Sequence, residues 1–238
     1  MSKRGQYVEE LAGIGPRPEA VREYLTANSN LPGPRGNLEL AHAFADWAPD
    51  ALVDELADEQ DEYLRFCADL ALGERLSRLD DAAVVVRLRA DASSGLWRVR
   101  EAVATGLQGV GDRDLPRLRA LVRDWVQDDD PLVQRAAAAA ICEPRLLVTE
   151  PGARAALDVC EEATRWIASL PAQRRRDDDV RTLRQALGYC WSVAVAADPE
   201  SGVPRFEHLR TSGDADVQWI VRENLKKNRL QRVLTEPR

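Results

Sequence analysis

The 238-residue sequence predicts an all-α protein organised as an α-solenoid, in which helix pairs stack one after another. Two observations lead to this fold class. Apolar residues recur at helical spacing through most of the chain, and no segment shows the sustained alternation expected of a β-strand. A short sequence pattern also returns at intervals typical of two-helix repeats.

The repeated pattern is clearest at two places. Residues 97–103 and 219–225 both have the form Trp-x-Val-Arg-Glu-x-apolar. Weaker copies, in which an apolar residue precedes Arg or Gln, begin at Leu64, Val133 and Val180. The five apolar positions are separated by about 34 to 47 residues, close to the range of two-helix solenoid repeats.

The helix boundaries are predicted from the capping residues, prolines and glycines between the apolar stripes. The acidic triplets at 128–130 and 177–179 each precede a helix, where carboxylates bind free N–H groups and oppose the helix dipole. Pro131 is suited to the first helical turn, and a turn is expected at Gly109 to Gly111. The best-defined helices are predicted over residues 19–27, 37–47, 114–126, 153–170 and 180–194.

The expected domain organisation is an irregular helical cap over residues 1–58, followed by one continuous array of repeats over residues 59–238. Residues 15–36 are rich in proline and glycine, which interrupts the helical pattern. A terminal repeat of a solenoid is atypical because it must present one polar outer face. For this reason the first segment is interpreted as a cap and not as a separate domain.

The composition argues against a membrane, secreted or metal-binding protein. The chain is 45% hydrophobic and 31% charged with a net charge of −7, and no apolar run approaches the ~20 residues of a membrane span. Glu9 and Glu10 stand where a signal peptide needs apolar residues, so a cytoplasmic location is expected. Four widely spaced cysteines and two histidines suggest neither disulfides nor a metal centre. We expect no cofactor.

The paired helices, the Val-Arg dipeptide that opens the second helix, and an Asp before it resemble HEAT repeats of the bacterial HEAT-like (lyase-type) kind. The resemblance covers residues 60–230 and is strongest at 97–107 and 217–230. It implies a right-handed α-solenoid of about five helix pairs. It says little about activity, because fold and function separate readily.

In such repeats, the Arg that follows the apolar residue is structural and bonds an Asp of its own or an adjacent turn. The resemblance therefore implies a structural ladder along the inner helices. Its members would be Arg65, Arg100, Arg181 and Arg222. The alternative is that the same arginines face a ligand in the concave groove.

A more distant resemblance is to the alkylpurine DNA glycosylases built from HEAT-like repeats. Their chemistry would use aromatic faces to hold a cationic damaged base and an aspartate to help it leave. Trp125 with Asp128 or Asp129 is the pairing that fits. However, the chain is acidic up to residue 200, whereas a protein that wraps DNA needs a broad positive face. Nucleic acid is therefore a disfavoured partner, and DNA repair is the alternative function.

The sequence favours a non-catalytic scaffold whose concave face binds a protein or peptide. It contains no phosphate-binding glycine loop and no Cys-His pair placed for nucleophilic catalysis, so no catalytic residue is assigned. Basic residues predominate after residue 200, where an aromatic residue and several cations coincide, as in many binding hot spots. The predicted binding residues are Trp219, Arg222, Lys226, Lys227 and Arg229. A bound small molecule, by analogy with lyase-type repeats, is a third hypothesis, and no membrane partner is expected.

Overall fold

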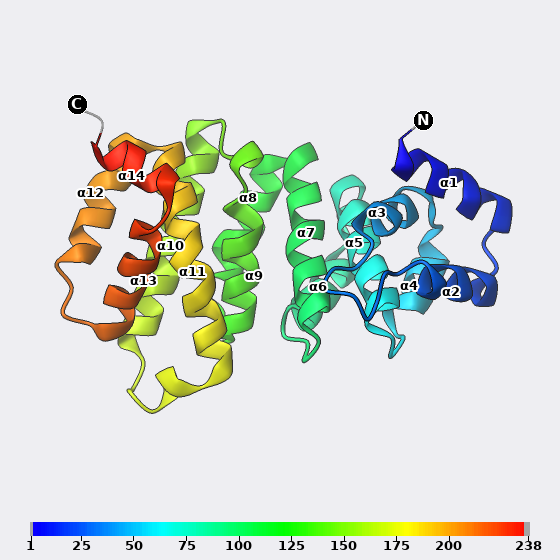
Figure 1. The fold of residues 1–238 in the computed structure, drawn as a ribbon, viewed down its shortest axis with the longest axis horizontal. Coiled ribbons are helices and arrows are strands. Elements are labelled where there is room, and N and C mark those ends of the chain that lie inside the picture. The colour runs from blue at the N-terminus through cyan, green and yellow to red at the C-terminus, as the bar shows by residue number, and fades with distance from the viewer. Residues whose placement is uncertain (1, 236–238) are drawn as a thin grey trace. The chain divides into compact units, whose positions relative to one another are not determined.

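The computed structural model describes residues 2–235, and every regular element in that range is a helix. The chain divides into two compact units, Met1–Arg113 and Asp114–Arg238. Both units consist of helices packed on one another, which confirms the predicted all-α, solenoid-type fold class (Figure 1). No helix in the described range is both long enough and apolar enough to cross a membrane.

The first unit is built around one central helix, α5, which packs against α2, α3, α4, α6 and α7. Asp61 begins α5 by accepting hydrogen bonds from the amides of Tyr63 and Leu64. The helices of this unit are α1 (Lys3–Ile14), α2 (Pro18–Ala27), α3 (Leu38–Trp47), α4 (Asp50–Ala57), α5 (Glu62–Arg78), α6 (Ala82–Ala92) and α7 (Trp97–Arg113).

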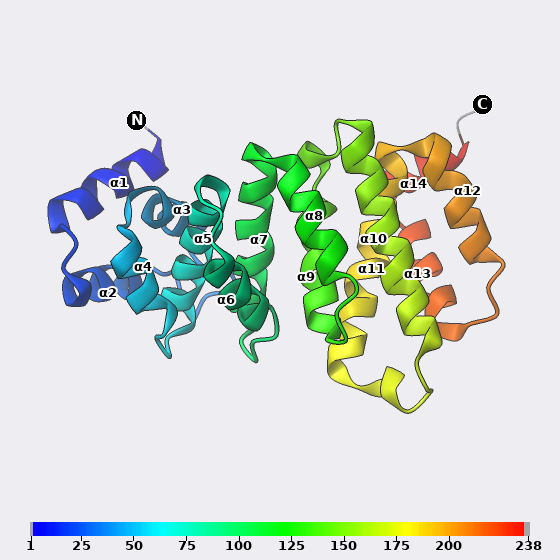
Figure 2. The ribbon, with the colours of Figure 1, turned by 180° about the vertical axis from the view of Figure 1, so that it is seen from behind.

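The second unit has a central helix of its own, α11, which contacts α9, α10, α12, α13 and α14. In Figure 1, α9, α11 and α13 form one layer of this unit, and Figure 2 shows α8, α10 and α12 from the opposite side. Its helices are α8 (Leu115–Trp125), α9 (Pro131–Ile141), α10 (Glu150–Ser169), α11 (Asp178–Ala197), α12 (Pro199–Arg210), α13 (Ala215–Leu225) and α14 (Asn228–Thr235), with short 3-10 helices at Pro144–Leu146 and Arg174–Arg176.

The five best-defined predicted helices all exist; one local expectation is wrong, and one helix was not predicted. The turn expected at Gly109 to Gly111 is wrong, because α7 continues to Arg113. The first helix, α1, was not predicted, since its apolar positions are few and only Leu11 is buried. The boundary predicted at residue 58 falls within the first unit, and the continuous array over residues 59–238 stays a prediction.

Two glycines set the distance between α5 and α7. A Cβ added at Gly73 would lie 2.4 Å from the Cα of Gly106, and one added at Gly106 would lie 2.9 Å from the carbonyl oxygen of Asp69. Neither position therefore has room for a side chain. The two helix backbones touch directly, and the large apolar residues beside the glycines pack around this contact.

A buried carboxyl pair lies near the same contact. Asp69 and Asp91 are both buried; Arg65 and Arg87 donate hydrogen bonds to Asp91, the latter at 2.6 Å. One oxygen of Asp69 has no hydrogen-bond partner among the described residues. Burial, together with the neighbouring Asp91, raises the pKa of Asp69 well above its usual range. The arginines therefore stabilise the charge of Asp91, while Asp69 favours its neutral form.

The contact between α5 and α7 predicts that a Gly→Ala substitution destabilises the protein at Gly73 and stabilises it at Gly109. Gly73→Ala is expected to lower the free energy of unfolding by about 1–3 kcal/mol, because the new methyl overlaps Gly106. Gly109→Ala is the matched control in α7, where no atom lies within 4 Å of an added Cβ, and it should raise that free energy by about 0.5–1 kcal/mol. Urea unfolding followed by circular dichroism measures both, and equal effects would contradict the proposed contact.

The carboxyl pair predicts a pH-dependent effect of Asp69→Asn. Because the folded-state pKa of Asp69 is raised, the stability that its neutral form contributes is present at low pH and is lost as pH rises. The Asn variant has no such loss, so its melting temperature should increase relative to wild type between pH 4 and pH 7. Asp91→Asn should instead lower the free energy of unfolding at pH 7 by about 1–3 kcal/mol, since one of the two arginines loses its acceptor oxygen and both lose the negative charge. A difference between Asp69→Asn and wild type that stays constant with pH would show that Asp69 is ionised in the folded state.

Candidate functional site

The predicted binding residues lie on α13, in the turn after it and, for Arg229, at the start of α14; α13 packs against α11 in the second unit (Figure 1). Asn224 of α13 is completely buried and forms hydrogen bonds with α11. Its amide nitrogen donates to the carbonyl oxygens of Leu187 and Ile220 at 2.8 Å, and its oxygen accepts from the amide of Ser192 at 2.8 Å. Because every polar atom of the Asn224 side chain is satisfied, the position of α13 on α11 is fixed.

The six-membered ring of Trp219 contacts α11 at Gly188, where there is no side chain. A Cβ added at Gly188 would be 2.9 Å from the Trp219 ring and 3.2 Å from the Cβ of Glu223. The guanidinium of Arg184 covers the ring at 4.8 Å from its centroid, and Arg184 also pairs with Asp216. Trp219 is therefore a partly exposed ring of α13 held against α11.

Two of the predicted cations meet at an aromatic residue that the sequence analysis did not single out. Lys227 and Arg229 lie over the ring of Tyr189, at 5.6 Å and 5.0 Å from its centroid. Arg229 also donates a hydrogen bond of 2.8 Å to the Tyr189 hydroxyl. Tyr189 is 43% exposed, so this group lies on the surface.

The remaining two predicted cations are exposed. Lys226 pairs with Glu223 at 2.6 Å, and the nearby positive charges lower the pKa of that carboxyl, with the Lys226 hydrogen bond as the largest cause. Arg222 forms no ion pair with any residue in the range 2–235. We call the surface formed by Tyr189, Trp219, Arg222, Lys226, Lys227 and Arg229 the α11–α13 surface.

A cavity of about 580 Å³ adjoins this surface at the start of α11 and α13. Four arginines line it with a single carboxylate, that of Asp216. We call it the arginine cavity, defined by Arg175, Arg176, Arg181, Arg184 and Asp216. The basic run at residues 174–176 is distant from α13 in the sequence. The proximity arises because Arg175 pairs with Asp214, the residue that caps α13.

The four arginines of the predicted ladder have four different environments. Arg65 pairs with Asp91 of α6, and Arg100 donates to the carbonyl oxygen of Ser94 at 2.5 Å. Arg181 lies 3.7 Å from Asp178 and is exposed, as is Arg222. The ladder itself stays a prediction, while Arg181 and Arg222 have guanidinium N–H groups open to solvent.

The Trp-Asp pair required by the glycosylase hypothesis is not available for stacking. Trp125 is only 2% exposed and belongs to the core of the second unit. Asp128 accepts the amide of Asp130, and Asp130 caps α9 through the amide of Leu132. The triplet therefore organises a helix start, and Trp125 offers no face to a damaged base.

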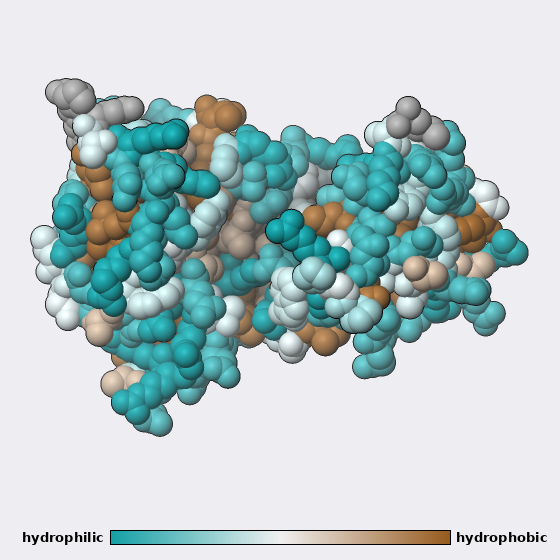
Figure 3. Space-filling model, in the orientation of Figure 1, coloured by the Kyte–Doolittle hydropathy of each residue, from teal (hydrophilic) through white to brown (hydrophobic). Residues whose placement is uncertain are grey.

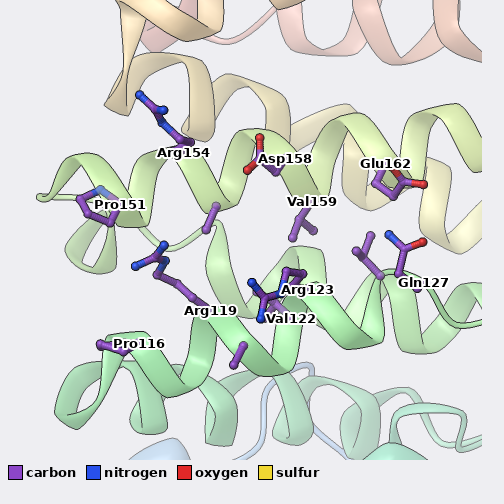
Figure 4. Close-up of a pocket in the computed structure, with 13 residues that line it drawn as sticks. Pro116, Arg119, Val122, Arg123, Gln127, Pro151, Arg154, Asp158, Val159 and Glu162 are labelled. Atoms are coloured by element: carbon purple, nitrogen blue, oxygen red, sulfur yellow. The ribbon is translucent and has the colours of Figure 1, made fainter.

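A second depression lies between α8 and α10 (Figure 4). It measures about 340 Å³ and has an apolar floor that includes Val122 and Val159. Arg119 and Arg123 approach it from α8, while the acidic Asp158 on α10 pairs with Arg205 at 2.6 Å. Its mixed charges favour no single class of ligand.

Three of the four cysteines are brought together although they are distant in sequence. The sulfurs of Cys142 and Cys160 are 3.6 Å apart, and Cys190 contacts Cys142. The contact with Cys160 raises the pKa of the Cys142 thiol, and burial raises that of Cys160. Between residues 2 and 235, no three His, Cys, Asp or Glu side chains are grouped to hold a metal ion.

No protein family model and no curated protein matches the chain. Among solved structures, two engineered proteins from a structural genomics consortium are similar, with 20% and 18% sequence identity and a TM-score of 0.41 each. The alignments cover 98% of this chain and 98% of the first protein, and 99% and 100% for the second. A designed armadillo repeat protein in complex with the peptide (KR)4 shares 14% identity, with a TM-score of 0.40 and coverage of 94% and 99%.

Burial of all four thiols predicts slow chemical modification. Since the thiolate is the reactive form and the thiols are buried with raised pKa values, native protein at pH 8 should react with Ellman's reagent far more slowly than protein unfolded in urea. Absorbance at 412 nm follows the reaction. A rapid rise in absorbance with native protein would show that a cysteine is accessible and reactive in the folded state.

Proposed function

We propose that the protein is a non-catalytic binding protein that recognises a segment of a partner protein on the α11–α13 surface. The observation that carries the proposal is Trp219, a partly exposed ring held between Gly188 and Arg184 and followed by exposed cations. Preorganised aromatic residues beside arginines are typical of binding hot spots, because they bury large area at little cost in conformational entropy.

The charges on this surface favour an acidic segment. Arg222 has no ion-pair partner in the described range, and Lys227 and Arg229 are held over Tyr189 by cation–π contacts. The face that carries α11 and α13 is mainly hydrophilic (Figure 3), so it offers little broad apolar area. A partner therefore gains affinity from complementary charge around one aromatic contact. A concave shape of this face stays a prediction.

A scaffold function has more support than the DNA-binding alternative. The aromatic residue that the glycosylase hypothesis needs, Trp125, is in the core. The positive residues beside Trp219 are local, and they accompany a net charge of −7. A duplex would require a wider positive face to displace its counterions.

The proposal is tested by site-specific photo-crosslinking in cells that express the full chain. A benzophenone amino acid at position 222, which is exposed on α13, is expected to crosslink a discrete protein that survives nuclease treatment. The matched control carries the same amino acid at position 165, an exposed arginine of α10 in the other layer of the unit. The control should give no such product.

Two substitutions decide whether the crosslink depends on this surface. Lys226→Glu is expected to reduce its yield at least about tenfold by reversing a charge, and Trp219→Ala combined with Lys226→Glu should abolish it. Circular dichroism melting checks that each variant remains folded. An undiminished crosslink in Lys226→Glu, or equal products from positions 222 and 165, would contradict the proposed surface. Loss of the folded state in the double variant alone would assign Trp219 to the core.

A further inference from the structure

The arginine cavity contains guanidinium groups in two different states. Arg175 is fully engaged by the protein: its Nε donates to the Leu170 carbonyl at 2.8 Å, and its two terminal nitrogens donate to Ala168 and Asp214. Its position in the cavity is therefore fixed, with Asp214 and Asp216 as its counterions. Few of its N–H groups remain for a ligand.

Arg184 is also held in place, but it keeps unused donors. Only its Nη1 donates to a protein acceptor in the described range, the carboxylate of Asp216. Its Cζ lies over the Trp219 ring at 4.8 Å from the centroid, and its buried Nε has no hydrogen-bond partner among the described residues. Because Nε is buried, the N–H groups of Arg184 that remain for a ligand are those of its terminal nitrogens.

The remaining two arginines are free to respond to a ligand. Arg176 is exposed and forms no ion pair with any residue between 2 and 235. Arg181 is 3.7 Å from Asp178, whose side chain is 99% exposed, so this pair is weak and screened by water. Arg176 and Arg181 can therefore turn toward an anion without breaking a strong contact.

Among the residues that line the cavity, positive charge exceeds negative charge, and Asp214 outside the lining is a counterion of Arg175. Four guanidinium groups face one lining carboxylate, Asp216, which is already shared by Arg175 and Arg184. Guanidinium forks match the oxygens of phosphoryl groups in paired hydrogen bonds. A phosphoryl group carries about −1.5 to −2 charges at neutral pH and three acceptor oxygens, so it satisfies several arginines better than one carboxylate does.

The surroundings favour a single phosphoryl group on a peptide over a polyanion. Asp177 and Asp178 are exposed directly beside the cavity, and Glu223 lies near Trp219. A nucleic acid strand brings a phosphate about every 3.4 Å, so its neighbouring phosphates would meet these carboxylates. A peptide with one modified side chain avoids this repulsion.

We propose that the arginine cavity binds the phosphoryl group of a phosphorylated segment of the partner protein. Arg176, Arg181 and Arg184 donate to the phosphoryl oxygens. The residues that flank the phosphorylated side chain then contact Trp219 and Arg222. This inference rests on the proposed function and names the chemical class of the bound segment.

The test measures binding of the full chain to three fluorescein-labelled degenerate nonapeptide pools by fluorescence anisotropy. The pools carry phosphoserine, glutamate or serine at the central position. The phosphoserine pool is expected to bind at least about tenfold more tightly than the serine pool, with glutamate between them. Arg176→Gln combined with Arg181→Gln should reduce this preference to about twofold or less.

The matched control removes the same charge elsewhere in the second unit. Arg154→Gln combined with Arg165→Gln alters two exposed arginines of α10 and should leave the phosphoserine preference unchanged. Both double variants should melt like wild type, because none of the four side chains is buried.

Two outcomes overturn the phosphoryl inference. One is equal binding of the three pools, or a preference that Arg176→Gln and Arg181→Gln leave intact. The other is tighter binding of a single-stranded oligonucleotide than of the phosphoserine pool, with the same dependence on Arg176 and Arg181. If the pools bind equally or the preference persists, a crosslink from position 222 would still support the proposed function. If the crosslink fails, the proposed function is overturned whatever the pools show.

Discussion

The structure depends on how closely its helix backbones can approach one another. In the first unit, Gly73 and Gly106 bring α5 and α7 into direct backbone contact. In the second unit, Gly188 leaves space on α11 that the ring of Trp219 fills. Side chains on either side of a glycine can pack only at the separation that the glycine permits, so these positions set the geometry of each layer.

The candidate site arises from the same constraint. Because α13 is held on α11 by Gly188 and by the buried Asn224, the arginines of α11 and the cations that follow α13 share one surface. Trp219 is covered on one side by α11 and partly by Arg184, which limits its motion without burying it. The contact between α11 and α13 thus fixes the aromatic and cationic side chains of the α11–α13 surface beside the arginine cavity.

The sequence predicted the fold class and the main helices because their apolar stripes and capping residues act locally. It was wrong about Gly109 to Gly111, since glycine and a helical interior are compatible when the surrounding side chains bury a continuous stripe. Part of the candidate site was also open to prediction, because an aromatic residue and several cations occur together at 219–229. Arg184 and Tyr189 were missed because nothing in their local sequence distinguishes them from other exposed helical residues.

By itself, the sequence determined the helical class, the positions of the best-defined helices and the basic character of the last segment. These features follow from periodicity, capping and charge, which depend on residues close in the chain. Only the tertiary structure decided that Trp125 is core while Trp219 is partly exposed, and that Arg176, Arg181 and Arg184 line one cavity with Asp216. Those outcomes depend on which helix faces meet, and residues that are 32 or more positions apart, such as Arg184 and Asp216, meet only when the helices have packed.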